Sequence, residues 1–438
     1  MNRWAPIRRG VTLAALTSLA MHAGGVHAAA KGEAKTPVPT TIKRIHYFAG
    51  DDGTEGFSPY GSLLLASDGN FYGTTFYGGP EDFRCNCSVG GTLYRMTPAG
   101  TLTVLHTFMT ADGASPSGGL AIGPDGAFYG TTYGGGDYGG GTAFKTDTSG
   151  AFTMLHSFGG AAGDGRQPYL GTLALGRDGN FYGTTSTGGA HQQGVLYRMT
   201  PAGAVTVLHA FGGGNDDGAT PRGGVTLGSD GNVYGTTLCG GANEAAGGCA
   251  GTVYRWSATA GFSVLHSFDA GAGARSGFGP QAALTERAGF LYGTTSLGGE
   301  AGAGTVFKLP LAGGVLTTLH SFGGGVGAPV PNLDGKDPVG RLLLARDGKL
   351  YGTTSNGGQY QTTHPEGDGT IFSIDASGAY ALVFSFGQAL SFGSHPLSAL
   401  ISGAGSDTAL YGVTESGNLN YTGIVYSVVP PKSTTKTK

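Results

Sequence analysis

The chain has 438 residues, a formal net charge of −3 and only 12% charged residues. It has no basic stripe to neutralise phosphates, which excludes a nucleic-acid-binding surface. Its 87 glycines show no Gly-X-Y period, which excludes collagen. The glycines lie between short apolar runs rich in Leu, Val, Phe, Tyr and Thr, and this alternation predicts an all-β protein.

Residues 1–30 have the three-part layout of an export signal. Arginines precede the apolar run VTLAALTSLAM, and small residues ending in VHA and AAA follow it. The layout predicts a signal peptide cleaved after Ala28 or Ala30, by either the Sec or the twin-arginine route. Residues 31–41 are then a linker. No later apolar stretch is long enough to span a bilayer.

The string YGTT returns throughout the rest of the chain, at intervals of 57, 53, 52, 58, 59 and 60 residues. Its seven copies, the last of them YGVT, begin at Tyr72, Tyr129, Tyr182, Tyr234, Tyr292, Tyr351 and Tyr411. Each interval holds four apolar segments of strand length, and the first interval contains GSLLLAS (61–67), NFYGTT (70–75), GTLYRMT (91–97) and LTVLHTF (102–108). Four strands per unit at this period predict a β-propeller.

The two ends of the repeat region complement each other. The last unit has three segments, SALISG, ALYGVT and GIVYSVV, before the polar residues 430–438. The missing fourth strand stands at the start, as IKRIHYF at 42–48. We therefore expect a single seven-bladed propeller over 42–429 with four-stranded blades. Residues 42–48 complete the last blade and close the ring, which removes two free strand edges. The tail at 430–438 is expected to be disordered.

The pattern FYGTTxxGG…GTLYRMTPxGxxTVLHxF resembles the GloVer tandem repeat of exported bacterial "choice-of-anchor" proteins, over about residues 42–429. The resemblance implies an exported repeat protein of undefined biochemistry, usually tethered by a C-terminal sorting segment. This chain departs from that pattern because its tail is polar and basic. We therefore expect a periplasmic or extracellular protein without a C-terminal anchor.

Loop lengths distinguish the two faces of the predicted ring. Asp-Gly turns such as SDGN (67–70) are expected to be type I′ hairpins, and turns such as TPAG (97–100) are also short. The second-to-third and fourth-to-first connections are long, and each fourth-to-first loop ends in Pro before an inner strand. Function on a rigid scaffold is usually carried by such loops, so the long-loop face around the channel mouth is the predicted functional face.

The YGTT copies themselves are interpreted as architecture. A residue repeated once per blade serves the blade, and no base accompanies the seven copies to activate a nucleophile. The mid-strand glycine is expected to allow close approach of a neighbouring blade. Six histidines lie in predicted outermost strands of different blades and cannot converge on a metal: His46, His106, His156, His209, His266 and His320. They are predicted to have structural roles.

Residues that break the repeat are the candidate site. The position after each entry proline is occupied in turn by Tyr60, Ser117, Tyr169, Arg222, Gln281, Val339 and Leu397. The candidate ligand-binding residues are Tyr60, Tyr169, Arg222 and Gln281 from this set. To these we add Arg341, the one charged residue expected on an inner strand. Loop aromatics able to stack on sugar rings are Phe57, Tyr77, Phe83, Tyr133, Tyr138, Phe278, Tyr360 and Tyr421. The alternative is that these are ordinary solvated or covering loop residues.

Four cysteines fit an oxidising compartment and are assigned to disulfides. Cys239 and Cys249 bracket the loop CGGANEAAGGC and are placed to staple it, whereas a bond between Cys85 and Cys87 would close a small strained ring. Their pairing stays open. Paired C-x-x-C spacings are absent, and aspartates before glycine favour Asx turns over calcium sites. No metal and no cofactor are predicted.

Three functions remain open. The favoured one is an exported, monomeric, non-catalytic module that binds a carbohydrate, a peptide or a cell-envelope protein through its long-loop face. The alternatives are a polysaccharide hydrolase or lyase on a propeller scaffold and a purely structural envelope or matrix protein. The sequence shows no paired carboxylates on its predicted inner strands and no G-x-S-x-G elbow, so no catalytic residue is assigned.

Overall fold

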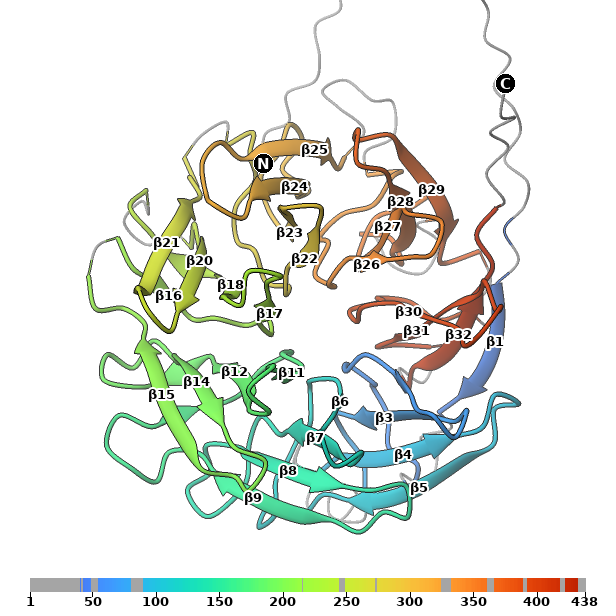
Figure 1. Cartoon of the computed structure of the whole chain (residues 1–438). Helices are drawn as coiled ribbons and strands as arrows, with labels where there is room; N and C mark the ends of the chain where they lie inside the picture. Colours follow the sequence, from blue (N-terminus) through green and yellow to red (C-terminus); the bar gives the residue numbers. More distant parts are fainter. Residues whose placement is uncertain are drawn as a thin grey trace, which may run out of the picture. The chain divides into compact units, whose positions relative to one another are not determined.

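The structure is a computed structural model. It describes residues 40, 42–48, 54–79, 90–214, 216–243, 249–271, 274–323, 332–360, 366–388, 392–417 and 422–431. The predicted signal peptide, nearly all of the predicted linker and residues 432–438 lie outside this part. Within it, every regular element is a β-strand, and no helix is long and apolar enough to cross a bilayer. Seven four-stranded antiparallel sheets surround a central axis, which confirms the predicted seven-bladed propeller (Figure 1).

The blades follow one another in chain order, and each is given from its innermost to its outermost strand. They are blade 1, β2 (Leu64–Leu65), β3 (Phe71–Thr75), β4 (Thr92–Met96) and β5 (Leu102–Thr107); blade 2, β6 (Ala121–Ile122), β7 (Phe128–Thr131), β8 (Thr142–Thr146) and β9 (Thr153–Ser157); blade 3, β11 (Ala174–Leu175), β12 (Phe181–Thr185), β14 (Val195–Met199) and β15 (Val205–Ala210); blade 4, β17 (Thr226–Leu227), β18 (Val233–Thr237), β20 (Thr252–Ser257) and β21 (Gly261–Ser267).

The remaining blades follow the same order. They are blade 5, β22 (Thr285–Arg287), β23 (Phe290–Thr295), β24 (Thr305–Pro310) and β25 (Thr317–Ser321); blade 6, β26 (Leu343–Leu344), β27 (Leu350–Thr354), β28 (Thr370–Ile374) and β29 (Tyr380–Ser385); blade 7, β30 (Ile401–Ser402), β31 (Leu410–Thr414), β32 (Ile424–Val428) and β1 (Ile42–Tyr47). Two short pairs, β10 (Gly165–Arg166) with β13 (Thr187–Gly188) and β16 (Gly218–Ala219) with β19 (Cys239–Gly240), join the long loops of blades 3 and 4.

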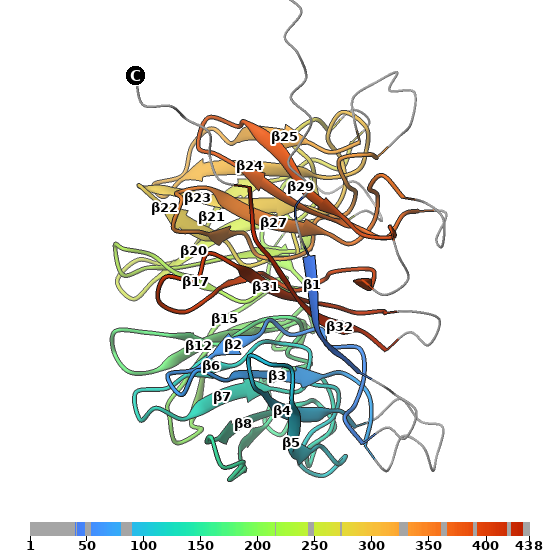
Figure 2. The same ribbon diagram turned by 90° about the vertical axis from the view of Figure 1, so that its right-hand side faces the viewer.

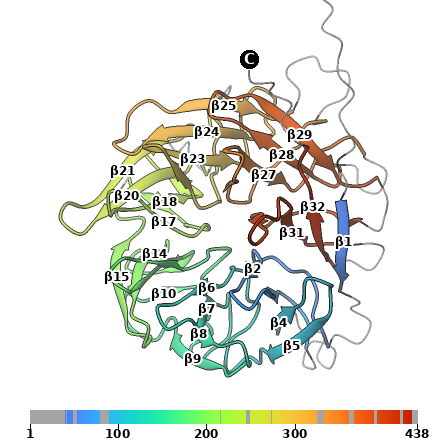
Figure 3. The ribbon, with the colours of Figure 1, turned by 45° about the vertical axis from the view of Figure 1, so that its right-hand side comes forward.

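Strands from the two ends of the chain complete blade 7, as predicted. β1 pairs antiparallel with β32, from Ile42 opposite Val428 to Tyr47 opposite Ile424. Figures 2 and 3 show β1 lying alongside β32 at the outer edge of the blade. Backbone hydrogen bonds between segments nearly 400 residues apart therefore hold the ring closed, and neither end strand is left as a free edge.

The Asp-Gly turns differ from the predicted type I′ form. In the first turn the Gly69 N–H donates to Ala66 O at 3.0 Å, and only Gly69 has a positive φ, of 81°. This geometry fits a type I turn followed by a glycine bulge. The aspartate is retained for its carboxylate, because Asp68 accepts hydrogen bonds from the Asn70 N–H at 3.0 Å and the Tyr72 hydroxyl at 2.8 Å.

In most blades the parts of YGTT have structural partners, as interpreted from the sequence. The first threonine reaches the inner segment of the next blade, as when Thr236 Oγ1 donates to Ala282 O at 2.9 Å. The second pairs within its blade, as Thr237 Oγ1 does with Thr252 Oγ1 at 2.8 Å. The prediction for the glycine was wrong. A Cβ on Gly235 would lie 2.3 Å from Tyr254 Oη, so the close neighbour is a ring of the same blade.

The residue before each entry proline joins two blades. These residues all have positive φ values, between 53° and 67°, and are Ser58, Ser115, Gln167, Thr220, Gly279, Asp337 and His395. In blade 2, the Ser115 N–H donates to Gly90 O of the preceding blade at 2.6 Å, and Ser115 O accepts from the Tyr133 N–H at 3.1 Å. Such backbone strain persists only where surrounding contacts impose it. Its repetition in every blade marks it as part of the architecture.

The outer-strand histidines pair with acids of the fourth-to-first loops in most blades. Nε2 lies within 3.3 Å of a carboxylate oxygen in the pairs His46–Glu55, His106–Asp112, His156–Asp164, His209–Asp217 and His320–Asp334. The aspartates also accept backbone N–H groups, as Asp217 does from Gly213 at 3.1 Å. Blade 6 replaces both partners by aromatic rings, Phe384 and Phe392, whose centroids are 6.2 Å apart. In these five blades the pairs therefore tie the long loop to the outer strand.

Candidate functional site

Two variable positions meet at the long-loop mouth of the ring. One follows each entry proline, and the other follows each YGTT string. The pre-proline residue hydrogen-bonds to the backbone of the residue after YGTT in all seven blades, for example Ser58 O to the Phe76 N–H at 3.0 Å. The side chains of the two variable positions are consequently neighbours, although about 16 residues separate them in sequence in blade 1.

Tyr60 lies in an aromatic and acidic cluster at the seam of blades 1 and 7. Its hydroxyl donates to Glu415 Oε1 at 2.7 Å, and its ring packs 4.7 Å from the ring of Phe76. Burial and the hydrogen bond to the Glu415 carboxylate raise the pKa of Tyr60 far above its usual value. Tyr60 is therefore a neutral donor at every physiological pH, with its ring half-buried at the mouth.

A second chain of contacts runs from blade 2 to blade 5. The rings of Tyr133 and Tyr169 meet edge to face at 5.5 Å, and the Arg222 guanidinium lies 5.4 Å from the centroid of Tyr169. Arg222 Nη1 donates to Gln281 Oε1 at 3.0 Å, and Gln281 Nε2 donates to Ser296 Oγ at 3.0 Å. These contacts hold polar groups beside two aromatic rings that remain partly exposed.

The structure thus joins Tyr169, Arg222 and Gln281 in one network. It places Tyr60 and Glu415 in a second cluster near it, and after burial the Glu415 charge contributes to raising the pKa of Tyr169. Two residues missed by the sequence reasoning, Glu415 and Ser296, complete these clusters. The signal for both was their position directly after YGTT, which varies between blades as much as the position after the proline does.

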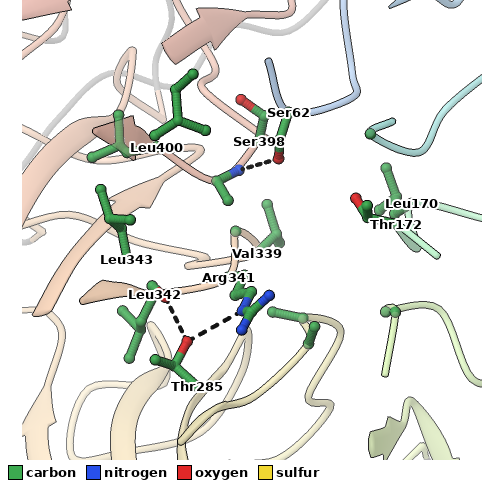
Figure 4. Close-up of a pocket in the computed structure, with 18 of the residues that line it drawn as sticks. Ser62, Leu170, Thr172, Thr285, Val339, Arg341, Leu342, Leu343, Ser398 and Leu400 are labelled. Atoms are coloured by element: carbon green, nitrogen blue, oxygen red, sulfur yellow. Dashed lines mark hydrogen bonds between the residues drawn. The ribbon is translucent and has the colours of Figure 1, made fainter. Parts of the chain in front are cut away.

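Arg341 lies deeper, within a central cavity of about 530 Å³ lined by inner segments of all seven blades. Its Nε donates to Thr285 Oγ1 at 3.3 Å, and the Thr285 hydroxyl donates to Leu342 O (Figure 4). Burial lowers the pKa of Arg341, although a guanidinium remains protonated at neutral pH. The expectation that Arg341 is the one charged inner-strand residue was wrong, because β22 also carries Glu286 and Arg287.

Among the other predicted residues, Tyr77 extends the Tyr60 cluster, because its ring lies 4.7 Å from the ring of Phe76 and stacks on Phe57 at 5.3 Å. Tyr138 borders a shallow rim hollow beside His156 rather than the mouth. Cys239 and Cys249 form a disulfide across the long loop of blade 4, with Cα atoms 4.0 Å apart. Phe83, Tyr421, Cys85 and Cys87 lie outside the described residues. Among the residues that are described, no group of three or more His, Cys, Asp or Glu side chains is placed to hold a metal ion.

The repeat itself is shared with other proteins. A family model described as the Gloeobacter/Verrucomicrobia repeat matches residues 34–247 and again residues 213–426. The chain belongs to this repeat family. The match confirms the resemblance drawn from the YGTT units. No curated protein sequence matches the chain.

Several solved structures are similar in fold. The extracellular domain of a putative one-component system from B. thetaiotaomicron superposes with a TM-score of 0.53 at 10% identity, covering 90% of this chain and 40% of that one. A putative 6-phosphogluconolactonase from Bacteroides fragilis gives 0.49 at 17% identity, covering 83% and 98%. A puromycin-hydrolysing peptidase from Mycobacterium tuberculosis gives 0.48 at 14% identity, covering 85% and 53%. At such identities none of these similarities indicates a shared activity.

Proposed function

We propose that this protein is an exported, non-catalytic binding module that holds a carbohydrate at the long-loop mouth of its propeller. The observation that supports this most is the network Tyr133–Tyr169–Arg222–Gln281, which no other part of the repeat reproduces among the residues that the structure describes. Sugar-binding surfaces combine aromatic rings, which pack on the apolar faces of sugar rings, with fixed amide and guanidinium groups that bond hydroxyls.

The mouth is asymmetric, as one binding site requires. Of the residues that follow the entry prolines, those of blades 1 to 5 are aromatic or polar, whereas Val339 and Leu397 of blades 6 and 7 are apolar. The signal-peptide layout of residues 1–30 and the Cys239–Cys249 disulfide favour an oxidising compartment outside the cytoplasm. The similar fold of an extracellular bacterial domain is compatible with that location.

The test compares two double variants by glycan array followed by calorimetry. Tyr169→Ala with Arg222→Ala removes the centre of the network and should weaken carbohydrate binding at least about tenfold, because aromatic and arginine anchors dominate such sites. Tyr138→Ala with Arg177→Ala changes the same residue types at the rim and at a turn, and it should bind like the original protein. Absence of carbohydrate binding in the unmodified protein, or equal loss in both variants, contradicts the proposal.

A further inference from the structure

The guanidinium of Arg341 stands in the central cavity without a counter-charge. Only its Nε has a partner, Thr285 Oγ1, and none of its remaining four N–H groups contacts an acceptor among the described residues. Figure 4 shows the side chain extending from the wall into the cavity, with Thr285 beneath it and Leu170 and Thr172 on the other side. Thr285 therefore fixes the orientation of a guanidinium whose Nη edge is free.

The cavity wall supplies no acid to this arginine. The described carboxylate that lines the cavity is Glu286, and it already accepts the Ser229 N–H at 2.6 Å and the Ser229 hydroxyl. A carboxylate close to Arg341 would raise the pKa of Arg341, whereas burial lowers it. The side chain lies between the channel walls but is exposed to the channel interior, so water solvates the guanidinium there and an anion can reach it. Low-dielectric walls around a channel strengthen the attraction of a cation for such an anion.

The ring leaves space in front of Arg341. The positions equivalent to Arg341 in the other six blades hold small residues, which are Ser62, Gly119, Thr172, Gly224, Ala283 and Ala399. Blades 2 and 3 are the farthest from blade 6 around a seven-membered ring, so Gly119 and Thr172 face Arg341 across the axis. Thr172 and Ser62 add hydroxyl groups that can donate to a ligand oxygen.

We propose that the central channel is an anion-binding site in which the Nη edge of Arg341 holds a carboxylate in a bidentate pair. A planar guanidinium matches the two oxygens of a carboxylate, and the channel hydroxyls serve its remaining lone pairs. A volume of about 530 Å³ is within the range of small-molecule sites, so the carboxylate can belong to a free organic acid or to an acidic sugar. This site does not rest on the carbohydrate site at the mouth.

The test titrates the whole protein with four probes at constant ionic strength: acetate, glucuronate, sulfate and glucose. Calorimetry should show carboxylate binding by the unmodified protein, and dissociation constants at least about tenfold higher in Arg341→Gln. Arg341→Lys should be intermediate, because it keeps the charge and loses the bidentate geometry. Arg177→Gln makes the same charge change at an exposed turn and should bind like the original protein.

The four probes and the Arg341 variants distinguish the possible outcomes. Glucuronate binding more tightly than acetate assigns the site to an acidic sugar, and equal binding assigns it to free organic acids; both support the carboxylate site. Sulfate binding without carboxylate binding overturns it, and so does equal carboxylate binding by the original protein and a folded Arg341→Gln. Arg341→Met, similar in length and uncharged, repeats the measurement if Arg341→Gln does not fold. Tyr169→Ala with Arg222→Ala should retain carboxylate binding, which keeps this test distinct from that of the mouth.

Discussion

Blades 4 and 5 are neighbours built on the same repeat, yet their polar residues differ in partners. In blade 4, Tyr234 donates to Asp230 at 2.7 Å and Thr236 donates to the next blade. In blade 5, Ala288 stands where that aspartate would be, and Thr294 Oγ1 has no partner among the described residues. The tyrosine of the repeat is thus kept in blade 5 without its aspartate, and the threonine is kept without its bond to the next blade.

Polar side chains of blade 5 form hydrogen bonds with residues of the candidate sites. Its Gln281 binds Arg222, its Ser296 binds Gln281, and its Thr285 binds Arg341. The blade that keeps fewer pairs of the repeat therefore supplies three side chains to the mouth and the channel. In this blade, residues that vary between repeats thus take part in the candidate sites, which agrees with the view that function is added to a fold at particular positions.

The largest expected effect concerns the YGTT glycine, which blades 4 and 5 both contain. Gly235→Ala in blade 4 places a Cβ 2.3 Å from Tyr254 Oη, and Gly293→Ala in blade 5 places one 2.5 Å from Phe307 Cζ. Both should lower the free energy of unfolding by about 3 kcal/mol, since overpacked cores force rings and backbone apart. Urea unfolding followed by circular dichroism measures the loss.

The control for this pair is Gly231→Ala in a turn of blade 4. An added Cβ there meets nothing within 4 Å, so only the positive φ of 82° is penalised. We expect a loss of about 1 kcal/mol. If Gly235→Ala lowers the free energy of unfolding no more than Gly231→Ala does, close packing against the third strand is not the reason why the YGTT position is glycine.

A smaller effect should separate the two blades. Tyr234→Phe removes a hydroxyl that donates to Asp230. The loss in the free energy of unfolding should be only about 1 kcal/mol, because the Asp230 carboxylate is largely solvated and water can replace the lost donor. Tyr292→Phe in blade 5 removes a hydroxyl without a hydrogen-bond partner in the described residues and should change stability by less than about 0.5 kcal/mol. Equal losses in the two variants would mean that the Tyr–Asp pair contributes nothing specific.

The sequence was sufficient for blade number and ring closure, because the seven YGTT copies set the period and Ile42–Tyr47 supplies the strand missing at the other end. It was not sufficient for the turns. Asp-Gly suits a type I′ turn and a bulged type I turn alike, and the hydroxyl of a tyrosine four residues on favours the latter. In blade 5 the turn residues Ala288 and Gly289 both have positive φ values, 50° and 80°. The predicted type I′ geometry thus occurs where the aspartate is absent.

The residues of the candidate site were predictable only where a local sequence signal marks them. The entry prolines marked Tyr60, Tyr169, Arg222 and Gln281, because a proline before a strand is visible in the sequence. Glu415 was not found, since its contact with Tyr60 joins residues 355 positions apart. That contact depends on the backbone hydrogen bond between the pre-proline residue and the residue after YGTT, and on closure of the ring. The spacing of residues along the sequence predicts neither of these.

The last expected effect appears only at low pH and concerns the outer strand of blade 4. Nε2 of His266 is buried without a hydrogen-bond partner in the described part of the chain, and Ser276 stands where other loops place an acid. Burial lowers the pKa of His266. The folded protein therefore takes up this proton less readily than the unfolded chain, and its stability falls as the pH drops below about 6.5. His266→Phe copies Phe384 of blade 6 and should remove this loss, giving a protein about 1 kcal/mol more stable at pH 5 and nearly unchanged at pH 8.

Urea unfolding at pH 8, 7, 6 and 5 measures this difference, and other titrating groups cancel because both proteins contain them. His209→Phe is the matched variant one blade earlier, where the ring lies 3.1 Å from Asp217. Burial raises the pKa of Asp217, but the His209 hydrogen bond and backbone N–H groups outweigh it and hold that pKa below its usual value. Removal of His209 should therefore destabilise the protein at pH 8, by about 1 kcal/mol. The opposite signs arise because a buried histidine stabilises this fold only where the long loop supplies its acid. If both variants respond alike, the His–acid pairs do not tie the loops to the outer strands.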